Sequence, residues 1–214
     1  MIKRIVVSGY GEAFAKPDIA EVGLKITSVQ PDAYKAQELV DAVTGKLLAE
    51  LQSLGVPKQD IETRSYALSP SYEWKNDSRV FRGYEVSNAL KVKVRDFSLI
   101  KQIIQVTVKL GVKEIDYINF KHEDKAALEQ EALKKAAVNA IERARAIADG
   151  LGVKMGPVIH VFDKSRSYGG RYSMVCESSY MPSPGPGNVV PPDEIKVTAE
   201  VEAVLELAGN EPDQ

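Results

Sequence analysis

One short motif, present in three copies, constrains the fold of this chain more than any other feature. The triplet Leu-Gly-Val occurs at residues 54–56, 110–112 and 151–153. Glycine readily adopts the left-handed backbone conformation that ends a helix, and the residue after it supplies the hydrophobic contact that closes the motif. Each triplet is followed by an extended segment, at residues 61–72, 115–120 and 158–162. We therefore expect a helix, a glycine stop and a strand three times over.

The first and third helices have clear starts and clear apolar stripes. Pro31-Asp32 starts the first helix, because the Asp32 carboxylate can accept hydrogen bonds from the first turn. The third begins near Asp124-Lys125 and carries Glu131 and Lys135 at the spacing of a favourable ion pair. The stripe of the first helix consists of Leu39, Val43, Leu47, Leu51 and Leu54. The stripe of the third consists mostly of small side chains: Leu128, Leu133, Ala136, Ala140, Ile141, Ala144, Ala148 and Leu151.

The segment before the second triplet has two interpretations. Residues 103–108 are rich in β-branched side chains, which favour a strand. We favour a helix that begins near Asp96-Phe97, because the glycine stop follows and one helical face is apolar. That face consists of Ile100, Ile103, Ile104, Thr107 and Leu110.

Alternating segments predict further strands. Residues 5–14 and 20–27 flank Lys16-Pro17-Asp18, a turn in which proline fixes the backbone and removes a donor. We therefore expect these two strands to form a hairpin. The remaining expected strands are the two arms of a second hairpin, 66–72 and 81–94 with a turn at 75–79, and a last strand at 195–207 with one wet face.

Together these elements predict an α+β fold, with an antiparallel or mixed β-sheet and three helices packed against it. The chain has 214 residues, of which 44% are hydrophobic and 27% charged, and this suits one domain with a sizeable core. We therefore expect a single domain over residues 1–214. Within it, residues 165–193 form an irregular loop rich in Tyr, Met, Pro and Gly.

That loop is the first candidate interaction surface. Loops of this length are uncommon in compact domains and are usually functional or disordered. Aromatic and methionine side chains are enriched where proteins contact one another, so we favour a contact surface over a disordered excursion. The side chains concerned are Tyr168, Tyr172, Met174, Tyr180 and Met181.

The second candidate surface is a set of aromatic side chains on the predicted hairpin: Tyr66, Tyr72, Trp74, Phe81 and Tyr84. These rings suit either a ligand platform or packing between neighbouring strands. Packing is favoured for all but Trp74, which adjoins the charged turn and has little core to enter. We therefore expect Trp74 to be an interaction residue.

Residue types that carry chemistry give no catalytic, cofactor or metal site. Cys176 is the single cysteine and lies beside Glu177, which disfavours the thiolate that a nucleophile needs. His122 adjoins a carboxylate pair, but three consecutive residues rarely converge on one ion. His160 alternates with aliphatic residues in a strand. Ser8-Gly9-Tyr10-Gly11 is only part of a dinucleotide motif and lacks the following helix, so we interpret it as a bulged strand.

Charge and hydropathy limit the partners and the location. The net charge is −2 with no concentrated basic patch, so we expect no nucleic-acid partner. No apolar run approaches the ~20 residues of a transmembrane helix. The first residues also lack the apolar segment of ~7–15 residues that a signal peptide needs. The sequence as written is therefore expected to be cytoplasmic, or exported if a leader has been removed.

Several segments taken together resemble the SIMPL-domain family, a bacterial family of unknown function. The resemblance covers nearly the whole chain and implies an α+β fold, homo-oligomerisation, usually an exported location, and a link to the cell envelope or oxidative stress. It implies no catalytic residues. The matching segments are 7–13 with 16–18, 54–56, 60–63, 69–72, 84–92, 146–152 and 197–201.

The sequence thus favours a non-enzymatic protein that self-assembles through strand edges and the loop at 165–193, without a cofactor. The alternative is a monomeric or dimeric module that binds a protein or ligand through the same loop and the hairpin at 66–84.

Overall fold

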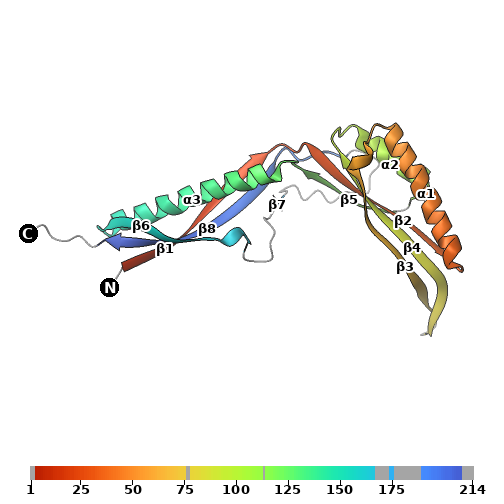
Figure 1. Cartoon of the computed structure of the whole chain (residues 1–214), viewed down its shortest axis with the longest axis horizontal. Coiled ribbons are helices and arrows are strands. Elements are labelled where there is room, and N and C mark those ends of the chain that lie inside the picture. Colours follow the sequence, from red (N-terminus) through yellow and green to blue (C-terminus); the bar gives the residue numbers. More distant parts are fainter. Residues whose placement is uncertain (1–2, 76–77, 113, 167–173, 176–188, 209–214) are drawn as a thin grey trace, which may run out of the picture. The chain divides into compact units, whose positions relative to one another are not determined.

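In the computed structural model, the described residues are 3–75, 78–112, 114–166, 174–175 and 189–208. They form two antiparallel β-sheets and three α-helices, so the predicted α+β fold class is confirmed (Figure 1). The helices are α1 (Ala33–Ser53), α2 (Leu99–Lys109) and α3 (Lys125–Gly150). The strands are β1 (Lys3–Ala15), β2 (Ile19–Gln30), β3 (Ile61–Lys75), β4 (Ser78–Val94), β5 (Glu114–Lys121), β6 (Lys154–Asp163), β7 (Met174–Val175) and β8 (Ile195–Ala208).

Residue contacts divide the chain into two compact units. The α3 unit consists of Met1–Pro17, His122–Met181 and Pro192–Gln214, and the α1/α2 unit consists of Asp18–Lys121 and Pro182–Pro191. Each unit is therefore built from separate stretches of sequence. Whether the two units fold together as the single expected domain stays a prediction.

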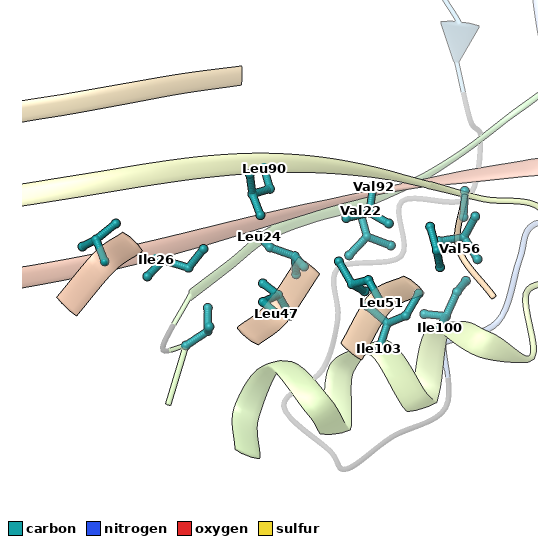
Figure 2. Packing of buried hydrophobic residues seen from close by; sticks show 14 of the residues in the cluster. Val22, Leu24, Ile26, Leu47, Leu51, Val56, Leu90, Val92, Ile100 and Ile103 are labelled. Carbon is teal, nitrogen blue, oxygen red and sulfur yellow. The ribbon is translucent and has the colours of Figure 1, made fainter. Parts of the chain in front are cut away.

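In the α1/α2 unit, a sheet of order β3-β4-β2-β5 packs against both helices. Alternate side chains of β2 and β4 supply the sheet side of the core, and Figure 2 shows Val22, Leu24 and Leu90 pointing at Leu47 and Ile103 from the helices. All five side chains are buried. The strand alternation that the sequence shows therefore places one face of each strand under the helices.

The predicted boundaries of α1 are confirmed, and its predicted stripe is partly wrong. Asp32 accepts a hydrogen bond from the Lys35 backbone N–H at 2.9 Å, and Gly55 ends the helix with φ of 90°. However, Leu39 is 48% exposed. The contact face is shifted round the helix, because it follows Ala36, Val40, Leu47 and Leu51, which are all buried.

The helical interpretation of residues 99–109 is correct. Ile100, Ile103 and Thr107 are buried, and the Thr107 hydroxyl donates to the Ile103 carbonyl oxygen at 2.7 Å. Burial of this face outweighs the strand preference of the β-branched side chains. Gly111 then ends the helix with φ of 81°, as Gly152 ends α3 with φ of 65°.

In the α3 unit, a sheet of order β1-β8-β6 packs one face against α3, and β7 pairs with β8. The small-residue stripe is confirmed at Ala136, Ala140, Ala144 and Ala148, which are buried. Leu151 falls outside it and is exposed, because it caps the helix instead of facing the sheet. The small side chains let helix and sheet approach closely.

The predicted hairpin of the first two strands is wrong. Residues 3–15 of β1 pair with β8 along their whole length, whereas β2 pairs with β4 and β5 in the other sheet. The reason lies in the side chains that each strand buries. β1 presents glycine and alanine to α3, and β2 presents large aliphatic residues to α1 and α2.

Most of the predicted irregular loop at 165–193 lies outside the described residues, so the loop as a whole stays a prediction. Met174 and Val175 form the short strand β7, whose backbone pairs with Val197 and Lys196 of β8. A two-residue strand carries no alternation, so its pairing partner alone defines it.

Candidate functional site

The described residues that could have a catalytic or metal-binding role either have structural roles or are exposed to solvent. Asp124 caps α3 by accepting from the Ala127 backbone N–H at 3.0 Å, and His122 lies half-buried just before it. His160 is exposed on β6, with its ring 6.2 Å from that of Phe162. Within the described ranges, no group of three or more His, Cys, Asp or Glu side chains could hold a metal ion. Cys176 lies outside those ranges.

The glycines of the partial dinucleotide motif have a packing role. A Cβ atom on Gly9 would lie 2.2 Å from the Ala136 carbonyl oxygen, and one on Gly11 would lie 2.1 Å from the Ala132 carbonyl oxygen. The pairing of β1 with β8 runs through both positions without a register shift, so the expected bulge is wrong. Both glycines are required by the close approach of α3, not by a phosphate.

The outer edge of β1 is partly closed by α3. The Tyr10 backbone N–H donates to Asn139 Oδ1 at 3.1 Å, and Arg143 donates to the Ser8 carbonyl oxygen at 2.7 Å. Side chains that bond an edge strand in this way leave fewer backbone groups for another chain to pair with.

The outer edge of β3 differs from that of β1. β3 is the edge strand of its sheet and pairs with β4 over its whole length, and no other strand among the described residues pairs with it. All 15 of its residues are exposed or half-buried, including Leu68, which is 50% exposed. Tyr66 ties β3 to α1, because its hydroxyl donates to Asp41 Oδ1 at 3.1 Å. Partial burial, with the Asp41 contact, raises the pKa of Tyr66 above its usual value.

The β3–β4 hairpin continues past the end of β2. The last residue of β2 that pairs with β4 is Gln30, opposite Tyr84, which itself pairs with Pro70 of β3. Gly83 marks this point with φ of 136°, where a Cβ atom would lie 2.3 Å from the Gln30 carbonyl oxygen. From there towards the turn, β3 and β4 pair with each other and with no other described strand, and Figure 1 shows their ribbons extending past the first turn of α1.

Four rings gather at this end of the hairpin, and we call Tyr72, Trp74, Phe81 and Tyr84 the aromatic end. The rings of Tyr72 and Phe81 lie edge to face at 5.6 Å, and those of Phe81 and Tyr84 at 5.4 Å. The Arg79 guanidinium lies 3.9 Å from the centre of the Tyr72 ring. Packing between strands is therefore confirmed for Tyr72 and Phe81.

Trp74 lies at the aromatic end, opposite Arg79, and is 75% exposed. Its exposure agrees with the expectation that it has no core to enter. Phe81 remains 48% exposed despite its ring contacts. Nearby, the Lys75 ammonium lies 2.5 Å from Glu73, and this contact lowers the pKa of the Glu73 carboxyl.

The other predicted interaction residues are only partly placed by the structure. Met174 lies in β7, whereas Tyr168, Tyr172, Tyr180 and Met181 lie outside the described residues. Their role in interaction stays a prediction. Sequence reasoning missed Arg79 over Tyr72, although cross-strand pairing in a predicted hairpin could have indicated it.

A second apolar surface, which sequence reasoning also missed, lies in the α3 unit. Val6, Tyr10 and Phe14 alternate along β1 with the residues that face α3, and all three are exposed. Strand alternation therefore puts them on the face of the sheet opposite the helix.

Comparison with known proteins identifies the family of this chain. The model of the SIMPL family, described as proteins of unknown function (DUF541), matches residues 5–205. This chain belongs to the SIMPL family. Its relatives include the 26 kDa periplasmic immunogenic protein of Brucella melitensis, 30% identical over 76% of this chain and 67% of the relative. They also include the uncharacterised protein YggE of Escherichia coli K12, 27% identical over 84% of this chain and 68% of the relative.

These relatives are not described as enzymes, and the family match carries no catalytic residues to this chain. None of the helices in the described part of this SIMPL protein is long and apolar enough to cross a membrane.

Proposed function

We propose that this SIMPL protein is a non-enzymatic protein that assembles into a homo-oligomer through the outer edge of β3. The observation that carries the proposal is the contrast between two edge strands. The edge of β1 is bonded by Asn139 and Arg143, whereas no strand in the described structure pairs with the outer edge of β3.

An unpaired strand edge is a template for another strand, because its N–H and C=O groups already point outward in a row. The apolar side chains of the same strand, such as Leu68, add ~25 cal/mol for each Å² that a second copy buries. Identical subunits that associate in this way usually form closed symmetric assemblies. A charged residue on the strand should oppose this association without disturbing the core.

The location proposed for this assembly is the periplasm. One relative is named as a periplasmic protein, and the shared family supports the same compartment here. Fractionation of cells that express the complete gene tests the location: recovery of the protein with cytoplasmic markers would contradict it.

The first prediction concerns the size of the particle in solution. We expect the unmodified protein at tens of micromolar to elute as an oligomer, and Leu68→Lys to shift it towards the monomer. Leu39→Lys is the matched control, because Leu39 is exposed to nearly the same degree on α1. Light scattering after gel filtration gives the mass directly.

Circular dichroism should show that Leu68→Lys and Leu39→Lys are both folded. Ala67→Lys offers a second charged substitution on β3. A strict monomer for the unmodified chain removes the assembly proposal. An equal loss of mass with Leu39→Lys would place the contact on α1 instead of β3.

A second candidate function is a monomeric or dimeric binding module, favoured by the exposure of the aromatic end. It predicts a chain of constant mass over the micromolar range, whose residues 165–193 become protease-resistant only when a partner is added.

A further inference from the structure

We propose that the aromatic end of the β3–β4 hairpin docks into the headgroup region of an anionic lipid bilayer. The proposal does not depend on assembly, because it uses the ring side chains at the end of the hairpin, whereas assembly uses the backbone edge of β3. It rests on the exposure of the rings, on the faces that they occupy and on the charges beside them.

Within the described structure, the end of the hairpin has less cover than the rest of its sheet. From Gly83 towards the turn, no other described strand joins β3 and β4, and α1 and α2 pack against β2 and the inner part of β4. Two strands without a third element are marginally stable in water. Exposed apolar side chains that cluster on such an element indicate a docking surface.

Exposed apolar residues on both faces of the hairpin favour insertion into a lipid bilayer over docking into a groove of a partner protein. Trp74, Tyr72 and Phe81 share one face, as their cross-strand pairing and ring contacts show. Val80 pairs with Glu73 at the next position, so strand alternation places it on the opposite face, where it is also exposed. A groove in a protein covers one face of a two-stranded ribbon, whereas lipid surrounds both faces of a ribbon end that inserts into a bilayer.

The residue types are those of a membrane interface. Trp and Tyr are enriched at the level of the lipid headgroups, because each ring has an apolar body and a polar handle. Lys and Arg with long stems place their charge at the same level.

The net positive charge at the end of the hairpin suits anionic headgroups. Between residues 72 and 84, the cations Lys75, Arg79 and Arg82 outnumber the anions Glu73 and Asp77 by three to two, a net charge of +1 in a chain of net charge −2. The Glu73 carboxylate is already paired with Lys75. Arg79 and Arg82 are therefore the cations that would meet lipid phosphates.

The test uses Trp74 as its own reporter, because it is the only tryptophan of the chain. The full-length protein is mixed with vesicles of phosphatidylcholine, with or without phosphatidylglycerol. We expect a blue shift of the emission and co-sedimentation with the anionic vesicles, and both should weaken as salt is added.

Two variants and one control locate the contact. The double change Arg79→Gln, Arg82→Gln should weaken binding to anionic vesicles by about 30-fold, from two lost surface cations. Phe81→Ser should reduce both the shift and the sedimentation. Tyr34→Ser, which removes an aromatic ring that is 69% exposed on α1, should leave binding unchanged. Circular dichroism confirms that each variant is folded.

Three results would overturn the proposal. The first is no blue shift and no sedimentation with anionic vesicles. The second is a loss with Tyr34→Ser equal to that with the tip variants. The third is a blue shift without vesicles that grows with protein concentration, because a second copy would then cover Trp74. Leu68→Lys separates the two proposals: a monomeric variant that still binds vesicles supports lipid docking whatever happens to assembly.

Discussion

At Gly9 and Gly11, the backbone of β1 lies directly against the backbone of α3. The same glycines suggest part of a nucleotide-binding motif when the sequence is considered by itself. The helix that follows the glycines in such a motif is replaced here by a helix more than a hundred residues later in the chain. At the scale of the residue, the absent side chain is what lets helix and strand touch.

This packing predicts opposite effects for two alanine substitutions. Gly9→Ala places a methyl group 2.2 Å from a carbonyl oxygen of α3, and we expect a loss of about 3 kcal/mol or more in the free energy of unfolding. Gly45→Ala, in α1 with nothing within 4 Å, should instead stabilise by about 1 kcal/mol. Urea unfolding measures both. A neutral Gly9→Ala would mean that α3 can move away from β1 without loss.

At the scale of the element, β3 pairs with β4 and makes side-chain hydrogen bonds to other elements. Tyr66 donates to Asp41 of α1, and Arg64 donates to the Tyr117 hydroxyl of β5. The Tyr66 phenol donates, so its contact exists only while Tyr66 is protonated. The elevated pKa of Tyr66 therefore makes this contribution to stability dependent on pH.

Tyr66→Phe tests that contribution. A folded-state pKa raised above ~10 means that the contribution is complete below pH 10 and is lost as pH rises through the higher folded value. Because the side chain is 46% exposed, we expect the variant to lose only about 0.5 kcal/mol at pH 7. The difference from the unmodified protein should vanish or reverse above pH 10, as measured by thermal unfolding. A difference that stays constant to pH 11 would contradict the assignment.

At the scale of the whole molecule, two cores are built from interleaved stretches of one chain. The chain changes unit after residues 17, 121, 181 and 191. The α3 unit therefore cannot form from one continuous segment, whereas every helix and strand of the α1/α2 unit lies within Asp18–Lys121. We infer that the units fold together, in keeping with the single domain expected from the sequence.

Calorimetry tests this inference with one core substitution in each unit. Leu47→Ala and Leu205→Ala each remove a fully buried side chain and should each cost about 2–5 kcal/mol. We expect one unfolding transition, which both variants shift to lower temperature. Two transitions, each responding to only one substitution, would show two independently stable domains.

The aromatic end shows which features of a candidate surface can be predicted from local sequence. Trp74 was expected to be exposed because it adjoins a charged turn, and it is. The rings that lie near it were harder to predict from the sequence, because the register shift beside Tyr72 brings Phe81 and Tyr84 to the same side. A period-two pattern without that shift would put those two rings on opposite faces.

Local chemistry was enough to determine the helices, their glycine stops and most strands of this protein. Asp32 and Asp124 cap helices through contacts three residues away, and Gly55, Gly111 and Gly152 end them through their own backbone conformation. Only the tertiary structure decided that β1 pairs with β8 and that no described strand pairs with the outer edge of β3. The physical reason is that strand pairing joins backbone groups that are alike in every residue, so partners are chosen by which distant surfaces fit together.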